Sequence, residues 1–146
     1  MQKIVFHSTI NSFRLLNKKK IRLVLASIFN NEGVHLESLN FVFCTDSYLL
    51  KINRDFLNHD FYTDIITFDL SEEASGAVTG EVYISIARVK DNALKLGVPF
   101  NEELLRVIFH GSLHLCGYKD KKKSEIAEMR QKEEQYLRLF KKLHSK

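Results

Sequence analysis

Residues 104–116 constrain the fold most, because almost every side of this segment is apolar when it is drawn as a helix. A helix that is apolar all round is buried in the core of a protein. Its polar side chains fall mainly on one stripe in which successive residues are four apart, namely Arg106, His110 and His114. The segment therefore predicts a central helix whose stripe alone reaches solvent or a partner inside the protein.

One domain should contain this helix, since the chain has 146 residues, of which 45% are hydrophobic and 27% are charged. No linker, repeat or low-complexity segment divides residues 1–146. The longest apolar runs are only a few residues long, and the start, MQKIVFHSTI, lacks the apolar block of a signal peptide. Cys44 and Cys116 are too few for a disulfide framework. We therefore expect a single-domain cytoplasmic protein that does not enter the membrane.

The first half of the chain predicts three strands and two helices. Strands are expected at 4–6, 39–44 and 64–70, where β-branched and aromatic residues gather. A helix capped by Asn17 carries one buried stripe, and a second helix capped by Thr45 or Asp46 points its own apolar residues inward. The inward residues are Ile21, Val24, Leu25 and Ile28 on the first helix and Leu49, Ile52 and Phe56 on the second. The succession of strand, helix and strand predicts that 39–44 and 64–70 run parallel with a right-handed crossover.

The second half predicts one more strand, at 80–84, and three helices. The link at 71–79 is too short for a crossover helix, so strand 80–84 should run antiparallel to strand 64–70. Helices are expected at 86–96, after a cap at Asn101, and after a cap at Ser124. The last of them carries the apolar residues Ile126, Met129, Leu137 and Phe140. The predicted class is α+β, with a mixed four-stranded sheet, mostly parallel with one antiparallel strand, packed with about five helices.

Three residues near the end of the central helix predict a metal site. His110 and His114 share one helix face, and Gly117 stands where a helix ends in a left-handed residue. The chain must then turn back, which brings Asp120 toward the imidazoles. Two imidazoles and a carboxylate match a catalytic zinc site, in which a fourth position is left for water. We expect His110, His114 and Asp120 to hold one divalent ion in a cleft, with the metal-bound water reactive and the general base unknown.

Two observations limit this interpretation. The two histidines are also consistent with the narrow solvent face of a core helix, which needs no metal. In HExxH metalloproteases a glutamate follows the first histidine, but here that position is Gly111, so the protease base is missing. A glycine there leaves room for a substrate or a strand to approach the metal closely. His59, in the loop before strand 64–70, is the other histidine of interest, whereas Cys116 is expected in the core.

Basic residues gather beside and after the predicted metal site. Residues 119–146 contain ten Lys or Arg against five Asp or Glu, whereas the whole chain has a net charge of only +4. A positive field beside a hydrolytic metal suits a polyanionic substrate. The candidates to bind such a substrate are Lys119, Lys121, Lys122 and Lys123. The alternative is that a Lys-rich terminus only keeps a small protein soluble.

The string HGSLHLCGYKDK resembles the signature HGxLHLxGYDH of the YbeY family of endoribonucleases. The matching positions are His110, Gly111, Leu113, His114, Leu115, Gly117 and Tyr118. INRDFLNHDFYTDIITF is similar to the family's LNxxYRxxxxPTDVLSF, with Asn53, Phe56, Thr63, Asp64 and Phe68 in register. GEVYIS resembles its GDIxIS, and Met129 and Glu133 match its final helix. The resemblance covers about residues 40–137.

The resemblance implies an α+β fold around a mixed four-stranded sheet, with a zinc-type site in a cleft. It also implies cleavage of single-stranded RNA in small-subunit rRNA 3′-end maturation and ribosome quality control, with rRNA and the small ribosomal subunit as partners. Asp120 stands where the family usually has a third histidine, which moves the metal preference from Zn toward harder ions such as Mn. Leu57 replaces a family arginine and Tyr62 a proline. Arg54, one turn earlier, is a candidate to contact phosphate instead.

Two other function classes remain open on the sequence alone. A ribosome-assembly factor without catalytic activity would use the ion structurally and dock its basic C-terminus on rRNA. A metal-dependent hydrolase of another substrate, such as a peptide, is a further alternative, although Gly111 argues against protease chemistry.

Overall fold

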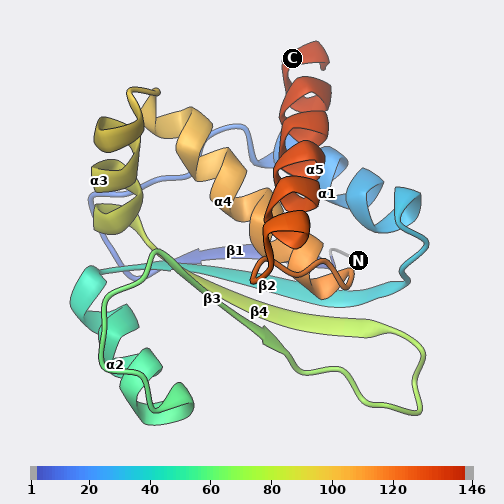
Figure 1. Ribbon diagram of the computed structural model, residues 1–146, viewed down its shortest axis with the longest axis horizontal. Helices are drawn as coiled ribbons and strands as arrows, with labels where there is room; N and C mark the ends of the chain where they lie inside the picture. The colour runs from blue at the N-terminus through green and yellow to red at the C-terminus, as the bar shows by residue number, and fades with distance from the viewer. Residues whose placement is uncertain (1–2, 144–146) are drawn as a thin grey trace.

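The computed structural model describes residues 3–143, in which a four-stranded sheet is covered by helices (Figure 1). Helices α1, α3, α4 and α5 lie over one face of the sheet, and α2 lies on the other side. The elements follow one another as β1 (Ile4–Ser8), α1 (Lys18–Asn31), β2 (Leu36–Cys44), α2 (Asp46–Leu57), β3 (Ile65–Asp69), β4 (Val78–Ser85), α3 (Ile86–Leu96), α4 (Phe100–Leu115) and α5 (Lys123–Lys142). Within residues 3–143, no helix combines the length and the apolar character that crossing a bilayer requires.

The sheet is mixed, with the strand order β1-β2-β4-β3. Strand β2 pairs in parallel with both β1 and β4, as in the partners Phe6 with Phe41 and Phe41 with Val82. Strand β3 pairs antiparallel with β4, with Ile66 opposite Tyr83. The predicted α+β class, with three parallel strands and one antiparallel strand, is confirmed.

The prediction that 39–44 and 64–70 run parallel is wrong, because β4 lies between these two strands and runs parallel to β2 but antiparallel to β3. Val82 and Ile84 of β4 are both fully buried, whereas β3 carries Thr67 and the exposed Asp69. The more deeply buried strand therefore occupies the centre of the sheet, and β3 takes the edge, where one side of a strand stays in contact with water. The parallel unit with a crossover helix is instead β1, α1 and β2.

Side chains of β3 alternate between the two faces of the sheet, as the pleat of a strand requires. Ile66 and Phe68 pack in the smaller apolar cluster with Leu49 and Ile52 of α2. On the opposite face, a Cβ atom added to Gly111 of α4 would lie only 2.9 Å from Cδ1 of Ile65 and 3.2 Å from Oγ1 of Thr67. Gly111 therefore lets α4 approach the sheet closely. Of the two neighbours expected at this glycine, a substrate or a strand, the structure places strands there.

Helix α4 is the central helix that the apolar pattern predicts. Ile108, Phe109 and Leu113 are fully buried in the main core. The polar stripe is only partly shielded, with side-chain exposures of 15% for Arg106, 21% for His110 and 28% for His114. These three side chains thus have apolar surroundings and one open side.

Several helix ends differ from the sequence prediction. Thr45 caps α2 through its side chain, as predicted, by accepting the Tyr48 N–H. Asn17 precedes α1 with a left-handed backbone and makes no side-chain cap, and α4 begins after Pro99, so Asn101 lies inside its first turn. Helix α5 begins before Ser124, because the Glu125 carboxylate accepts the backbone N–H of Lys122 at 2.9 Å.

One predicted inward residue of α2 and one apolar residue of α5 are exposed instead. Phe56 has 70% of its surface exposed and Ile126 has 44%. Phe56 touches Phe68 edge-on at the rim of the sheet, because α2 contacts the sheet mainly through Leu49 and Ile52. The remaining predicted core positions on α1, namely Ile21, Val24, Leu25 and Ile28, are buried.

Candidate metal centre

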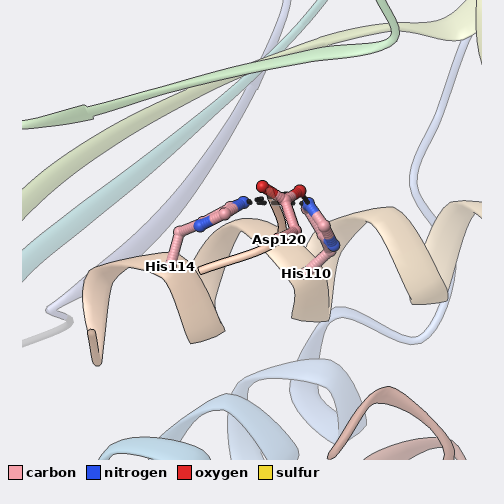
Figure 2. A group of neighbouring side chains, drawn as sticks. All are labelled: His110, His114 and Asp120. Atoms are coloured by element: carbon pink, nitrogen blue, oxygen red, sulfur yellow. Dashed lines mark hydrogen bonds and ion pairs between the residues drawn. The ribbon is translucent and has the colours of Figure 1, made fainter. Parts of the chain in front are cut away.

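His110, His114 and Asp120 converge at the end of α4 (Figure 2). Gly117 ends the helix with a φ of 102°, which turns the chain back so that Asp120 faces the two imidazoles. The Nε2 atoms of the two histidines lie 3.0 Å apart. Oδ2 of Asp120 lies 3.2 Å from Nε2 of His110 and 3.2 Å from Nε2 of His114. Among residues 3–143 this is the one group of three or more potential ligands whose donor atoms lie close enough for a shared ion.

Each imidazole is held through its other nitrogen. Nδ1 of His110 lies 2.7 Å from Oε2 of Glu133, and Nδ1 of His114 lies 2.8 Å from the carbonyl oxygen of Tyr118. Both partners accept hydrogen bonds, so both Nδ1 atoms carry the proton and both Nε2 atoms present lone pairs. A carboxylate or carbonyl behind the ring is the usual arrangement for a histidine that ligates a metal.

This donor set fits a divalent cation. When both imidazoles are neutral, two Nε2 lone pairs and a carboxylate oxygen at 3.0–3.2 Å from one another repel unless a cation, either a proton or a metal ion, lies between them. Ligands at ~2.0–2.2 Å from a tetrahedral ion are separated by about 3.3–3.6 Å, slightly more than these distances. The three atoms would thus need to open only slightly to ligate zinc or a metal of similar size.

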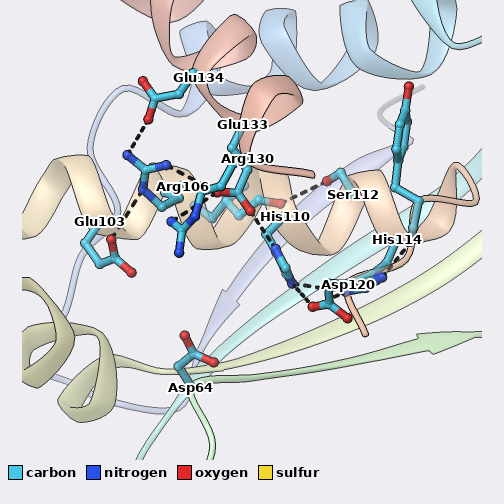
Figure 3. Close-up of polar contacts among 12 residues, drawn as sticks. Asp64, Glu103, Arg106, His110, Ser112, His114, Asp120, Arg130, Glu133 and Glu134 are labelled. Atoms are coloured by element: carbon cyan, nitrogen blue, oxygen red, sulfur yellow. Dashed lines mark hydrogen bonds and ion pairs between the residues drawn. The ribbon is translucent and has the colours of Figure 1, made fainter. Parts of the chain in front are cut away.

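The surroundings of His110 favour positive charge. Burial alone lowers the pKa of His110, but the hydrogen bond and charge of Glu133, together with Asp120 and Asp64, raise that pKa above its ordinary value. Glu133 is itself 5% exposed and accepts a hydrogen bond from Nη1 of Arg106 at 3.2 Å. Arg106 also donates to Glu134 at 2.7 Å (Figure 3), so a chain of charged groups on α4 and α5 fixes the orientation of His110.

Two further carboxylates lie beside this chain of contacts. Burial raises the pKa of Glu103, whose Oε1 has no hydrogen-bond partner among the described residues and lies 3.6 Å from Nε of Arg106. Burial also raises the pKa of Asp64, and its Oδ2 accepts a hydrogen bond from Asn92 at 3.1 Å. Asp64 comes from the start of β3 and lies across from α4 (Figure 3).

Two cavities meet at the histidines, and both are lined by Asp64, Ile65, His110 and Asp120. The first, about 280 Å³, extends between α4 and α5 past Arg106, Arg130 and Glu133. The second, about 480 Å³, also includes His114 and extends under the loop before β3, past His59 and Phe61. The candidate metal centre therefore lies at the junction of two spaces that a substrate could enter.

The predicted substrate-binding residues lie outside these two cavities. Four exposed lysines lie around Asp120 and at the start of α5, namely Lys119, Lys121, Lys122 and Lys123. Arg54 forms an ion pair with Asp60, and both side chains are largely exposed. The four lysines thus surround the turn that carries Asp120, whereas the guanidinium of Arg54 already has a carboxylate partner.

Glu133 and Arg106 are the residues of the site whose role the sequence did not predict. Glu133 lies on α5, in another helix from His110, so no local spacing connects the two. A signal was nevertheless present, because Glu133 shares one face of α5 with the buried residues Met129, Tyr136 and Leu137. A charged residue on a buried stripe requires a polar partner in the core.

Comparisons with known proteins identify the family of this chain. The family model described as Endoribonuclease YbeY matches residues 6–141. A curated Endoribonuclease YbeY of Cytophaga hutchinsonii is 48% identical over 138 residues, covering 94% of this chain and 96% of that protein. The Endoribonuclease YbeY of a Porphyromonas gingivalis strain is 42% identical over 137 residues, covering 94% of this chain and 89% of that protein.

A solved structure supports the same assignment at the level of the fold. The solution structure of a Thermotoga maritima protein superposes with a TM-score of 0.66 at 28% identity, covering 94% of this chain and 88% of that one. Because the family model spans most of the chain and the curated relatives align over nearly their whole lengths, the chain belongs to the YbeY family of endoribonucleases.

Proposed function

We propose that this chain is a metal-dependent endoribonuclease that cleaves single-stranded RNA and acts in rRNA maturation. The more specific part of the proposal is 3′-end processing of small-subunit rRNA and ribosome quality control, carried out in the cytoplasm by one domain that spans the chain. Family membership supports the activity. The observation that carries the mechanism is that both imidazoles are anchored through Nδ1 while both Nε2 atoms face the Asp120 carboxylate.

His110, His114 and Asp120 would hold the ion, with Zn as the first candidate and Mn as the second, since one ligand is a carboxylate. A divalent ion bound there supplies a Lewis acid for phosphoryl oxygens and lowers the pKa of water toward neutrality. Glu133 and the Tyr118 carbonyl keep each imidazole in the tautomer that can ligate. The apolar contacts of α4 with the sheet fix the backbone that carries both rings.

The remaining groups of the site act on the RNA. The exposed lysines at 119 and 121–123 place positive charge next to Asp120, which attracts the phosphate backbone and speeds encounter. Arg106 and Arg130 line the first cavity and offer guanidinium groups within it. Glu133 and Glu134 partly neutralise Arg106, so its main role is to orient Glu133.

An RNA-cleavage assay with controlled metal content tests this proposal. The protein should cut a single-stranded RNA, spare the same sequence in a duplex, lose activity in a chelator, and regain it with Zn or Mn. His114→Ala should abolish cleavage without unfolding the protein, while His35→Ala, at a distant cavity, should leave it unchanged. Full activity of His114→Ala would contradict the metal mechanism. RNA binding without cleavage at any metal concentration would support a non-catalytic assembly factor instead.

A further inference from the structure

The loop between α2 and β3 exposes an aromatic pair. The rings of His59 and Phe61 stack with centroids 5.1 Å apart and an angle of 22° between their planes. Phe61 is 55% exposed, and neither ring belongs to the two apolar clusters that make up the core. Exposed aromatic side chains contribute little to folding, so a pair held in this way points to a binding role.

The loop is held in place by the buried Asn53 of α2, which is 2% exposed. Its side-chain amide donates to the carbonyl oxygen of Phe61 at 2.9 Å, and its backbone carbonyl accepts the N–H of His59 at 3.1 Å. Asn58 ends α2 in a left-handed conformation, and Asp60 pairs with Arg54. The two rings are therefore presented on a preorganised backbone, which lowers the entropy lost when a ligand binds.

The aromatic pair and the metal centre share one cavity. His59 and Phe61 line the space of about 480 Å³ that also contains His110, His114 and Asp120. The rest of its lining is mixed, with apolar Leu57 and Ile65 and polar Asn53, Thr63 and Thr67. A nucleotide matches this mixture, because its base has apolar faces and polar edges, while its phosphate would lie toward the metal centre.

We propose that the His59–Phe61 pair stacks a base of the RNA strand next to the phosphate that lies at the metal centre. This inference rests on the proposed function and names the part of the protein that selects unpaired RNA. Aromatic side chains bind single strands by stacking on exposed base faces, with little dependence on sequence. In a duplex both faces of each base are covered by its neighbours, so a duplex offers nothing for the pair to stack on.

Binding measurements with three variants test the proposal. Each protein is titrated with a short unstructured RNA in EDTA, so that no cleavage occurs. Phe61→Leu removes the ring but keeps an apolar side chain, and it should weaken binding about tenfold. Phe61→Tyr keeps the ring and should bind like the unchanged protein. Phe56→Leu is the matched control, because Phe56 is also an exposed phenylalanine but lies outside the cavity.

Abasic RNA identifies the role of the ring. Oligonucleotides that lack one base at successive positions are titrated against the unchanged protein and Phe61→Leu. At one position, loss of the base should weaken binding by the unchanged protein about tenfold, and Phe61→Leu should then cause no further loss. The proposal would be overturned if Phe61→Leu lowered the affinity equally for intact RNA and for every abasic RNA. It would also be overturned if Phe61→Leu bound intact RNA as tightly as the unchanged protein.

Cleavage of the same RNA with metal added separates this inference from the proposed function. If the RNA is cleaved but the effects of Phe61→Leu and of base removal are independent at every position, the stacking site is refuted and the proposed nuclease activity stands. If those two effects are coupled at one position but no RNA is cleaved, the nuclease activity is refuted and the stacking site stands.

Discussion

Nδ1 of His110 on α4 lies 2.7 Å from Oε2 of Glu133 on α5, so a buried carboxylate sets the direction in which the histidine presents Nε2. Arg106 and Arg130 approach the other carboxylate oxygen of Glu133 at 3.2 Å and 3.7 Å. The charge of Glu133 is thus oriented by two guanidinium groups and directed at the imidazole. This contact connects the last helix of the chain to the metal centre.

Replacing Glu133 by Gln should weaken metal binding. The amide oxygen can still accept the Nδ1 proton, but the negative charge that favours a cation at His110 is lost. Loss of such a partner behind a ligand typically lowers metal affinity about 10–100-fold. Calorimetric titration with zinc measures the change. Glu134→Gln is the control, because Glu134 contacts Arg106 but not His110. Equal affinities for Glu133→Gln and the unchanged protein would show that the contact is only structural.

Replacing Gly111 by Ala should destabilise the fold. The new Cβ would lie 2.9 Å from Cδ1 of Ile65 and 3.1 Å from Cγ1 of Val82. Overpacking costs about 1–3 kcal/mol, whereas Ala gains at most about 1 kcal/mol over Gly in a helix. We therefore expect a net loss of about 1 kcal/mol in urea unfolding.

A double variant checks the cause of that loss. Ile65→Val removes the methyl group that the new Cβ meets first, so Gly111→Ala with Ile65→Val should be more stable than the sum of the single changes predicts. If the two changes in unfolding free energy were strictly additive, the loss caused by Gly111→Ala would not come from the contact between α4 and Ile65.

Glu32→Gln should destabilise the protein near neutral pH and have less effect in acid. Burial raises the pKa of Glu32, but hydrogen bonds from Tyr118, Tyr136 and Lys132 outweigh burial and lower it below 4.5. A lowered carboxyl pKa stabilises the fold above the unfolded-state value, and that contribution is lost as the pH falls through the folded-state pKa. We expect Glu32→Gln to lower the free energy of unfolding by about 2 kcal/mol at neutral pH, and by less below pH 4.5. Urea unfolding of both proteins across this range measures it.

Tyr118 connects Glu32 to the candidate metal centre. The Tyr118 hydroxyl donates to Glu32 at 2.6 Å, while the Tyr118 carbonyl accepts from His114. Tyr118→Phe is the matched control, since it removes one hydrogen bond and keeps the carboxylate. Equal stability differences at acidic and neutral pH would contradict the assignment of the effect to ionised Glu32.

The helices and their buried faces could be predicted from periodicity, because Ile21, Val24, Leu25 and Ile28 follow the spacing of a helix. Strand pairing could not, since the position of β4 between β2 and β3 depends on which strand buries more apolar surface in the whole sheet. Phe56 shows the same limit. Its spacing matches that of Leu49 and Ile52, but Phe56 lies beside Phe68 at the edge of the sheet, where its side chain stays exposed.

The grouping of His110, His114 and Asp120 in the candidate metal centre could be predicted from residues that are close in sequence. The spacing of His110 and His114, together with the turn at Gly117, is local, and the structure brings Asp120 to the place that the turn implies. Of the partners behind the rings, the Tyr118 carbonyl is local to His114, but Glu133 comes from α5. Asp64, which lies across from α4, directly precedes β3 and is also distant in sequence. His59 was noted only from its position in the loop, and its stacking on Phe61 depends on how Asn53 holds that loop.

Diffraction data collected on crystals grown with zinc or manganese, at wavelengths around each metal's absorption edge, would locate a bound ion. We expect one anomalous peak bonded to Nε2 of His110, Nε2 of His114 and the Asp120 carboxylate, and the peak's wavelength dependence would identify the ion. A metal bound elsewhere, or a cleft without a peak and with Asp120 turned to solvent, would contradict this prediction.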